Sequence, residues 1–490
     1  MKMPHRRMTQ VGNVPGIIWG AVGMAAFLGL FTPNPGLTVS SFLLLAWFFI
    51  LLWRQGEPPI LLLALGLQWL QVVTKVFNAD VLGLPVNALN TYQGDMEKAI
   101  WLSMIALAIL ALGMRLALTH FKSPGRESAR NEAMLFSVNK LWFFYLVSLG
   151  ISFSVLAVAW VLPSLTQIAL ALANLKWVVY FMFAYVCFLR VERMPLLLLA
   201  FGIELALGLG GYFSDFKTVF FVTILAFVAS GKKLSGQQIG IVLSLTAALF
   251  VMSLTWTAVK TDYREYLSGG QRAQIVTRGY AERVDYLFEL VSALERKDMG
   301  NALQGMADRL SYTDFFGRAL VTVPSRIPHE EGALWGGVFK HIFMPRLFFP
   351  DKPSLRDDSD ITNYYTGLRF SGAGQGTSVS IGYVAESYID FGPLGMFVPV
   401  LALGYLCGRM YRYFLSRPKM PHIVGYGLAV VVLMNTIHFE TTNVKLVGGL
   451  VTSFLVAFVV QKFFVNKFVR RLVPKRVSRT GKVLYTPRQA

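Results

Sequence analysis

The chain is divided by one polar stretch, Lys260 to Asp390, which contains His341-Ile-Phe-Met-Pro-Arg-Leu-Phe-Phe-Pro-Asp-Lys-Pro353 and runs into Ile381-Gly-Tyr-Val-Ala-Glu-Ser-Tyr-Ile-Asp-Phe-Gly392. On both sides the sequence is a series of apolar segments. Loops that stand on a rigid scaffold carry function disproportionately often. We therefore expect the chemistry of this protein to lie in this stretch.

The composition is typical of a membrane protein. Of the 490 residues, 54% are hydrophobic and 15% are charged, and the mean hydropathy is +0.52, whereas soluble domains are about 25% charged. The apolar runs are continuous rather than alternating, which predicts helices. We predict an all-α polytopic protein with about 12 transmembrane helices and one large, partly helical external loop. The expected spans are residues 16–31, 37–53, 58–77, 99–119, 139–162, 169–190, 195–212, 215–230, 238–258, 392–413, 422–438 and 446–466.

The spans divide the chain into four regions. Residues 1–258 form an N-terminal membrane bundle of about nine spans, and residues 259–391 form a large loop. Residues 392–466 form a C-terminal bundle of about three spans, and residues 467–490 are a basic tail. Connections 120–138, 190–194, 231–237 and 409–421 are basic, and the tail has eight Lys or Arg and no acid. Because cytoplasmic loops carry the excess of Lys and Arg, we expect both termini in the cytoplasm and the large loop outside.

The charges exclude several functions. The formal net charge is +19, yet the loop is nearly neutral, with 15 basic and 17 acidic residues. The basic flanks therefore predict contact with anionic membrane lipid, and without a DNA-binding motif we expect no nucleic acid. The six histidines lack ligand spacing, and Cys187 and Cys407 lie in apolar runs, so we expect no metal site and no disulfide. There is no phosphate-binding glycine-rich loop, which argues against a cytoplasmic nucleotide.

Local patterns predict order inside the loop. Residues 280–297 and 302–320 have helical spacing of apolar side chains, and Pro324 and Pro328 should end the second helix. The apolar piece Ala333 to Phe343 is expected at the membrane surface. Residues 351–377, which are rich in Gly, Ser and Asp, are expected to form a mobile lid.

Two loop segments carry candidate chemistry. In the first, prolines stiffen the backbone around Arg346 and Lys352, whose cations suit a phosphate; an interfacial anchor is the alternative. In the second, Glu386 and Asp390 are four residues apart and share one helix face, with Tyr383 nearby. A carboxylate at an apolar boundary can act as a base, and a solvated helix start is the alternative.

Ionisable residues inside or beside the spans are further candidates, because charge in the hydrocarbon is costly. Each of the candidate residues lies at the expected outer end of a span or within a span. Simple ion pairs, Asp215 with Lys217 and Glu440 with Lys445, are the alternative. The candidates are Lys176, Glu204, Asp215, Lys217, His438, Glu440 and Lys445.

Both loop segments resemble those of bacterial polysaccharide repeat-unit polymerases of the Wzy type. Members have many spans and one large outer loop late in the chain. That loop tends to carry a Pro-Arg...Pro-x-Lys-Pro segment and then Gly...Glu-x-Tyr-x-x-Phe-Gly-x-x-Gly. The matching residues here are Pro345, Arg346, Pro350, Lys352 and Pro353, followed by Gly382, Glu386, Tyr388, Phe391, Gly392 and Gly395.

The resemblance implies a glycosyltransferase in the bacterial inner membrane that needs no cofactor. Its substrate would be an oligosaccharide repeat unit on undecaprenyl pyrophosphate, and the growing glycan would move onto the next lipid-linked unit. Glu386 would be the base, with Asp390 or His438 as alternatives, and Arg346 would stabilise the leaving pyrophosphate. Substrate-binding candidates are Lys352, Lys217, Asp215, Tyr383, Tyr388, Arg326, His341 and Trp335.

Other functions stay open at this point. An O-antigen ligase-like transferase would use the same donor with a different acceptor, and a transporter or flippase of lipid-linked glycans would suit twelve spans. A structural scaffold is a further alternative. The resemblance also implies a chain-length regulator and a flippase as partner proteins. The enzyme hypothesis requires the segments around Arg346 and Glu386 to meet Lys217 and His438 around one cavity.

Overall fold

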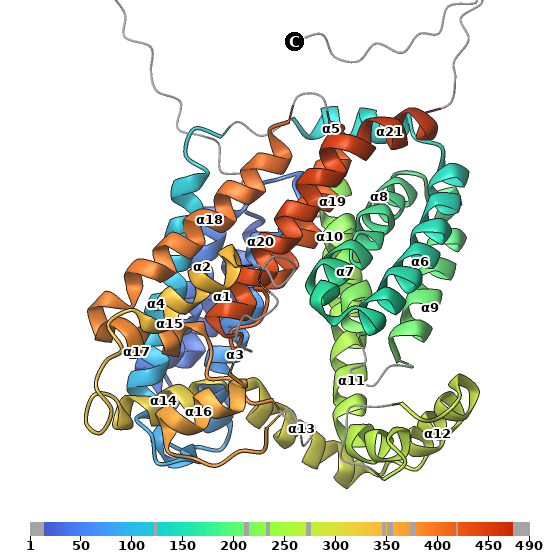
Figure 1. The fold of residues 1–490 in the computed structure, drawn as a ribbon. Coiled ribbons are helices and arrows are strands. Elements are labelled where there is room, and N and C mark those ends of the chain that lie inside the picture. Colours follow the sequence, from blue (N-terminus) through green and yellow to red (C-terminus); the bar gives the residue numbers. More distant parts are fainter. Residues whose placement is uncertain are drawn as a thin grey trace, which may run out of the picture.

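The protein is helical throughout the part that the structure describes. The computed structural model describes residues 14–121, 125–209, 215–231, 236–270, 276–344, 349, 356–372, 378–417 and 420–473. Every regular element in these ranges is a helix (Figure 1). The predicted all-α class is therefore confirmed for these residues. A helix satisfies its own backbone polar groups, which a long apolar segment in a bilayer requires.

The described residues confirm only part of the predicted set of membrane-spanning helices. Among the described residues, seven helices are long and apolar enough to cross a membrane, or eight if α17 (Tyr383–Gly395) and α18 (Phe397–Leu415), bent by 117°, count as one span. The count of about twelve is not confirmed. One reason is length: α1 (Gly16–Gly29) and α10 (Lys217–Ser230) have 14 residues each, so they extend about 21 Å against a hydrocarbon core of about 30 Å.

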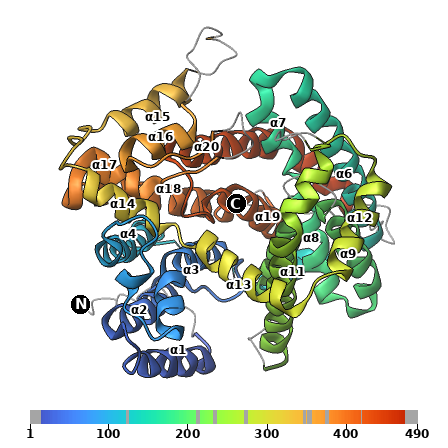
Figure 2. The same ribbon diagram turned by 90° about the horizontal axis from the view of Figure 1, so that it is seen from below.

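The helices form two groups around a central helix (Figures 1 and 2). The first group is α1, α2 (Pro35–Leu52), α3 (Ile60–Val81), α4 (Met96–Ala117) and α18. The second is α6 (Val138–Val161), α7 (Thr166–Ala173), α8 (Lys176–Leu189), α9 (Met194–Leu209), α10 and α11 (Gly236–Leu267). Helix α19 (His422–Leu433) is buried along its whole length and contacts α3, α8 and α18, so it joins the groups.

The loop helices lie at one end of the bundle. Helices α12 (Tyr280–Ser292), α13 (Arg296–Leu310), α14 (Thr313–Thr322) and α16 (Asp358–Thr366) are at the bottom of Figure 1, opposite α5 (Arg126–Met134) and α21 (Asn466–Leu472). α13 contacts both α3 and α11 and so bridges the two groups. Helix α15 (Ala333–Phe343) packs on α20 (Asn443–Val460). Short 3₁₀ turns at Val86–Leu89, Pro163–Leu165, Val191–Arg193 and Met434–Thr436, and a π segment at Gln461–Val465, complete the elements.

The predicted loop helices are found in part. A helix begins at Tyr280 as expected but ends at Ser292. The stretch predicted as one helix over 302–320 belongs to two, since α13 ends at Leu310 and α14 runs from Thr313 to Thr322, before Pro324. The stretch 351–377, expected to be a mobile lid, includes α16, whose Ser359, Thr362 and Thr366 are buried. This part of the stretch is a packed helix because its small polar side chains find partners: the Thr362 hydroxyl donates to the Val379 carbonyl at 2.9 Å.

Helices α4 and α18 approach each other through glycine. A side chain at Gly404 of α18 would collide with the Leu110 carbonyl of α4, and one at Gly408 would collide with the Met114 carbonyl. Gly113 of α4 meets the backbone of α18 in the same way. Small residues four apart allow such backbone contact between membrane helices. This contact fixes the position of α18 and, through the bend before it, of α17.

We predict that Gly404→Leu lowers the thermal stability of the protein in detergent. The larger side chain must push α18 away from α4, at a cost of about 3 kcal/mol or more in the free energy of unfolding. The matched control is Gly150→Leu in α6, where a side chain meets open space. Melting monitored by size-exclusion chromatography measures both variants. Equal melting temperatures for the two variants would contradict the close packing of α4 and α18.

Candidate functional site

Helix α17 starts against the connection between α19 and α20. Gly382, its N-cap, has φ +89°, a conformation that glycine adopts without steric cost. A side chain at Gly382 would lie 2.8 Å from the Phe439 carbonyl oxygen. Glycine at this position therefore allows α17 to begin next to residues 437–442.

Glu386, the predicted base, lies in the first turn of α17 and is 3% exposed. Its Oε2 accepts the backbone N–H of Asn443, the first residue of α20, at 2.7 Å. A carboxylate at a helix N-terminus satisfies an unpaired N–H and complements the helix dipole. The Glu386 side chain therefore joins α17 to the start of α20.

Asp390 binds the N-terminus of α15 in the same way. Its two carboxylate oxygens accept the backbone N–H groups of Leu334 and Trp335, at 3.0 and 2.8 Å, in the first turn of α15. The indole N–H of Trp335 donates to the Ser387 hydroxyl at 3.0 Å. Both carboxylates of the predicted pair are thus committed to helix N-termini, on two different helices.

The two tyrosines of α17 point into the protein. Tyr383 is fully buried and its hydroxyl donates to Gln68 Oε1 of α3 at 2.7 Å. Tyr388 is also buried, and its hydroxyl donates to the Val323 carbonyl at 3.1 Å. Trp335, a third predicted sugar-stacking residue, is buried as well. The positions of these rings give no support to the prediction that they stack on sugars.

A more accessible group of polar side chains lies beside α17, and we call Asp215, Lys217, His438 and Glu440 the His438 cluster. His438 is half-exposed, and its Nδ1 lies 3.3 Å from Glu440 Oε1. The other oxygen of Glu440 accepts from Gln71 Nε2 at 2.9 Å. Lys217 is close enough to interact electrostatically with Glu440. The cluster thus joins α3, the start of α10 and the connection before α20.

Asp215 borders this cluster from the residues before α10. Its Oδ1 accepts from the Thr218 hydroxyl at 2.7 Å, and Lys176, His438 and Lys217 act on it electrostatically. Burial raises the pKa of Asp215, although its side chain keeps solvent contact. Asp215, Lys217 and His438 are exposed side chains of the cluster, and Glu440 is partly buried.

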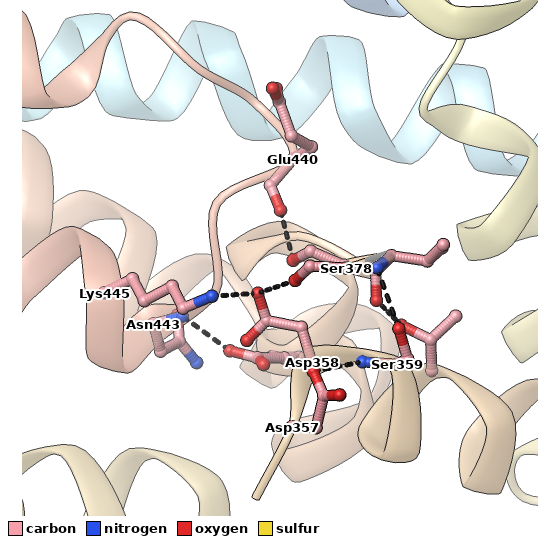
Figure 3. Close-up of polar contacts among 11 residues, drawn as sticks. Asp357, Asp358, Ser359, Ser378, Glu440, Asn443 and Lys445 are labelled. Carbon is pink, nitrogen blue, oxygen red and sulfur yellow. Dashed lines mark hydrogen bonds and ion pairs between the residues drawn. The ribbon is translucent and has the colours of Figure 1, made fainter. Parts of the chain in front are cut away.

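A second polar group lies on the other side of the same connection. Lys445 Nζ pairs with Asp358 Oδ2 at 2.5 Å, and the Ser378 hydroxyl donates to the same oxygen at 3.4 Å (Figure 3). Asp358 and Lys445 both act electrostatically on Glu386. Lys445 therefore pairs with Asp358. The ion pair between Glu440 and Lys445, which was the alternative hypothesis from the sequence, is not found.

Residues 438–445 connect the two groups. They carry His438 and Glu440 at one end and Asn443 and Lys445 at the other, and the Ser380 hydroxyl donates to the Glu440 carbonyl at 2.5 Å. Glu386 contacts this connection at Asn443, and His438 lies at its other end. That the segments around Arg346 and Glu386 meet Lys217 and His438 around one cavity stays a prediction.

Other predicted residues lie elsewhere or outside the described part. Arg346 and Lys352 are outside the described residues, so the cationic segment is not placed. Arg326 is exposed on the turn after α14, and His341 is half-buried near the end of α15. Neither is in the His438 cluster.

Two buried ion pairs connect the helices around the site. Lys176, named from its position in a span, pairs with Glu204 at 2.6 Å, and the Tyr145 hydroxyl donates to Glu204 at 3.1 Å. Lys75 of α3 pairs with Asp314 of α14 at 3.1 Å. Sequence reasoning missed Lys75 and Asp358, although Lys75 is a charge inside a predicted span, which is a usable signal.

The described side chains of the site are of the types that transfer protons and bind anions. They include an accessible imidazole 3.3 Å from a carboxylate, and lysines on either side of residues 438–445. Among the described residues, no group of three or more His, Cys, Asp or Glu is placed to hold a metal ion.

These features define a protein whose described residues are helical, with several helices long and apolar enough to span a membrane and a polar site beside α17. Residues 98–473 match a family model described as "Domain of unknown function (DUF8712)", and the chain belongs to this family. No curated protein and no solved structure matches the chain.

We predict that Asp390→Ala loosens α15. The substitution leaves two buried N–H groups without an acceptor, which costs about 3 kcal/mol. Hydrogen–deuterium exchange of peptides covering residues 333–343 should accelerate. Asp360→Ala, which removes an exposed carboxylate from α16, is the control and should leave exchange unchanged. Unaltered exchange in Asp390→Ala would show that this carboxylate does not hold α15.

Proposed function

We propose that this protein is a membrane glycosyltransferase that polymerises lipid-linked oligosaccharide repeat units. The growing glycan would pass from undecaprenyl pyrophosphate to a hydroxyl of the next lipid-linked unit, at the outer face of a bacterial inner membrane. The observation that supports this best is the His438 cluster, in which a half-exposed imidazole lies 3.3 Å from Glu440 with Lys217 nearby. The reaction needs a base for the acceptor hydroxyl and a cation for the anionic leaving group, and His438 and Lys217 can supply them.

The proposed reaction is a displacement at the anomeric carbon. The acceptor hydroxyl oxygen forms a bond to C1 of the donor sugar, and the bond from C1 to the pyrophosphate oxygen breaks. The hydroxyl proton passes to His438 Nε2, because Nδ1 faces Glu440. The pyrophosphate leaves with the bonding electrons, and lysine and arginine cations stabilise its charge. Lys217 is the described cation for this role, and Arg346 and Lys352 are those that the resemblance adds.

The proposal assigns different roles to His438 and Glu386. Glu386 is buried, and its carboxylate accepts the Asn443 N–H, so we assign it to holding residues 438–445 in place. His438 reaches solvent and can meet a substrate hydroxyl. Proton transfer therefore belongs to His438 in this mechanism, and Glu386 acts through it as a positioning residue.

The orientation in the membrane is part of the proposal. Asp360 lies on α16 and Asn131 on α5, at opposite ends of the bundle, and both are exposed. If both termini are cytoplasmic and the loop is outside, a membrane-impermeant thiol reagent should label Asp360→Cys in intact cells. It should label Asn131→Cys only after the membrane is disrupted. Cys187 and Cys407 are buried and give a low background. The reverse labelling pattern would place the site in the cytoplasm.

We predict that His438→Asn reduces polymer formation by at least about a hundredfold, because a positioned base contributes that much or more. Purified protein is incubated with lipid-linked repeat units, and product length is measured on a gel. The control is His120→Asn, an exposed histidine remote from the site, which should keep full activity. Full-length polymer from His438→Asn would contradict the assignment.

The same assay separates base from positioning residue. Glu386→Gln keeps an oxygen that accepts the Asn443 N–H but cannot take a proton. Substantial activity in Glu386→Gln supports positioning, whereas loss as complete as in His438→Asn would transfer the role of base to Glu386.

Adding a chelator to the same assay tests whether the reaction requires a metal ion. We expect the length and the amount of the product to stay unchanged.

A further inference from the structure

A cavity at the end of the bundle opposite the loop combines charge with apolar surface. It has a volume of about 520 Å³ and lies between the last turns of α18 and Phe454 of α20. Arg409, Arg412 and Arg417 line it, with Leu406 and Met410 beside them. α18 runs from α17 toward the end that carries α5 and α21 (Figure 1). We call this the arginine cavity.

The three guanidinium groups carry more positive charge than the C-terminus of α18 needs for its neutralisation. Arg412 donates to the Thr119 carbonyl at 3.2 Å, beyond the end of α4, and Arg417 lies 3.9 Å from the Tyr413 ring centre. A helix C-terminus carries the equivalent of about half a negative charge, which one cation neutralises. Among the described residues that line the cavity, none is Asp or Glu. The cavity therefore presents strong positive charge to a ligand.

Part of the cavity wall is apolar. Phe454 packs against Tyr413 with ring centres 5.2 Å apart, and Leu406 and Met410 extend this surface along α18. A free inorganic anion would gain nothing from such a wall. A molecule with an anionic head and a hydrocarbon chain would use both surfaces, since guanidinium groups bind phosphate oxygens in pairs.

We infer that the arginine cavity binds the phosphate head group of an anionic membrane lipid, with a chain of the lipid along Phe454. Basic pockets between membrane helices bind such head groups at the cytoplasmic leaflet, and the charge pattern of the sequence predicts this end to be cytoplasmic. The lipid is a resident ligand, separate from the glycan substrate proposed for the His438 cluster. The inference rests on the membrane orientation proposed above and not on the proposed transferase activity.

Lipid titration onto the full-length protein in neutral detergent tests the inference. Phosphatidylglycerol should raise the melting temperature in a saturable manner, and phosphatidylcholine and inorganic phosphate should not. The test variant is Arg409→Gln/Arg417→Gln, in which both side chains are exposed, so folding should be retained. It should bind phosphatidylglycerol at least about tenfold more weakly, because the paired phosphate contacts are lost.

A charge-matched control excludes a general surface effect. Arg470→Gln/Arg471→Gln removes two exposed arginines from α21 at the same end of the bundle and should bind within about twofold of the wild type. Equal weakening in both double variants would overturn the inference in favour of diffuse attraction. Saturable stabilisation by inorganic phosphate alone would overturn it in favour of a free-anion site. Native mass spectrometry counts the bound lipid, and one fewer in the test variant is expected.

Discussion

Two carboxylates buried on one short helix organise the loop end of this protein. Glu386 and Asp390 lie on α17 and are 3% and 1% exposed, so each must find donors inside the protein. Each finds them at the N-terminus of another helix, where backbone N–H groups have no intrahelical partner. Glu386 thereby holds α20 and Asp390 holds α15. The loop is connected to the membrane bundle through these bonds.

This arrangement depends on where α17 is placed. The chain turns at Gly392, which has φ +70°, and continues into α18 at 117° to α17. α18 is in turn held by backbone contact with α4 through Gly404 and Gly408. A change in the α4–α18 contact would therefore move both carboxylates together. It would also move residues 438–445, whose position depends on Glu386 and on the Ser380 hydroxyl.

The sequence located part of the candidate site. Apolar runs identified helices, and costly charges within or beside them identified Asp215, Lys217, His438 and Glu440, which the structure brings together. The partners were not predictable, because they come from distant parts of the chain: Glu440 meets Gln71 and Lys445 meets Asp358. Helical spacing correctly placed Glu386 and Asp390 on one helix. It could not show that their carboxylates bind the starts of two different helices.

By itself the sequence determined the helical class, the distribution of charge along the chain and the start of the first loop helix at Tyr280. These properties depend on local composition and periodicity, which a single segment carries. Tertiary structure alone decided which side chains are buried and which reach solvent. It showed Tyr383 and Tyr388 pointing inward and His438 half-exposed. It also showed which helices of the described residues are long enough to span a membrane, because the length and bend of a helix depend on its neighbours as well as on its own residues.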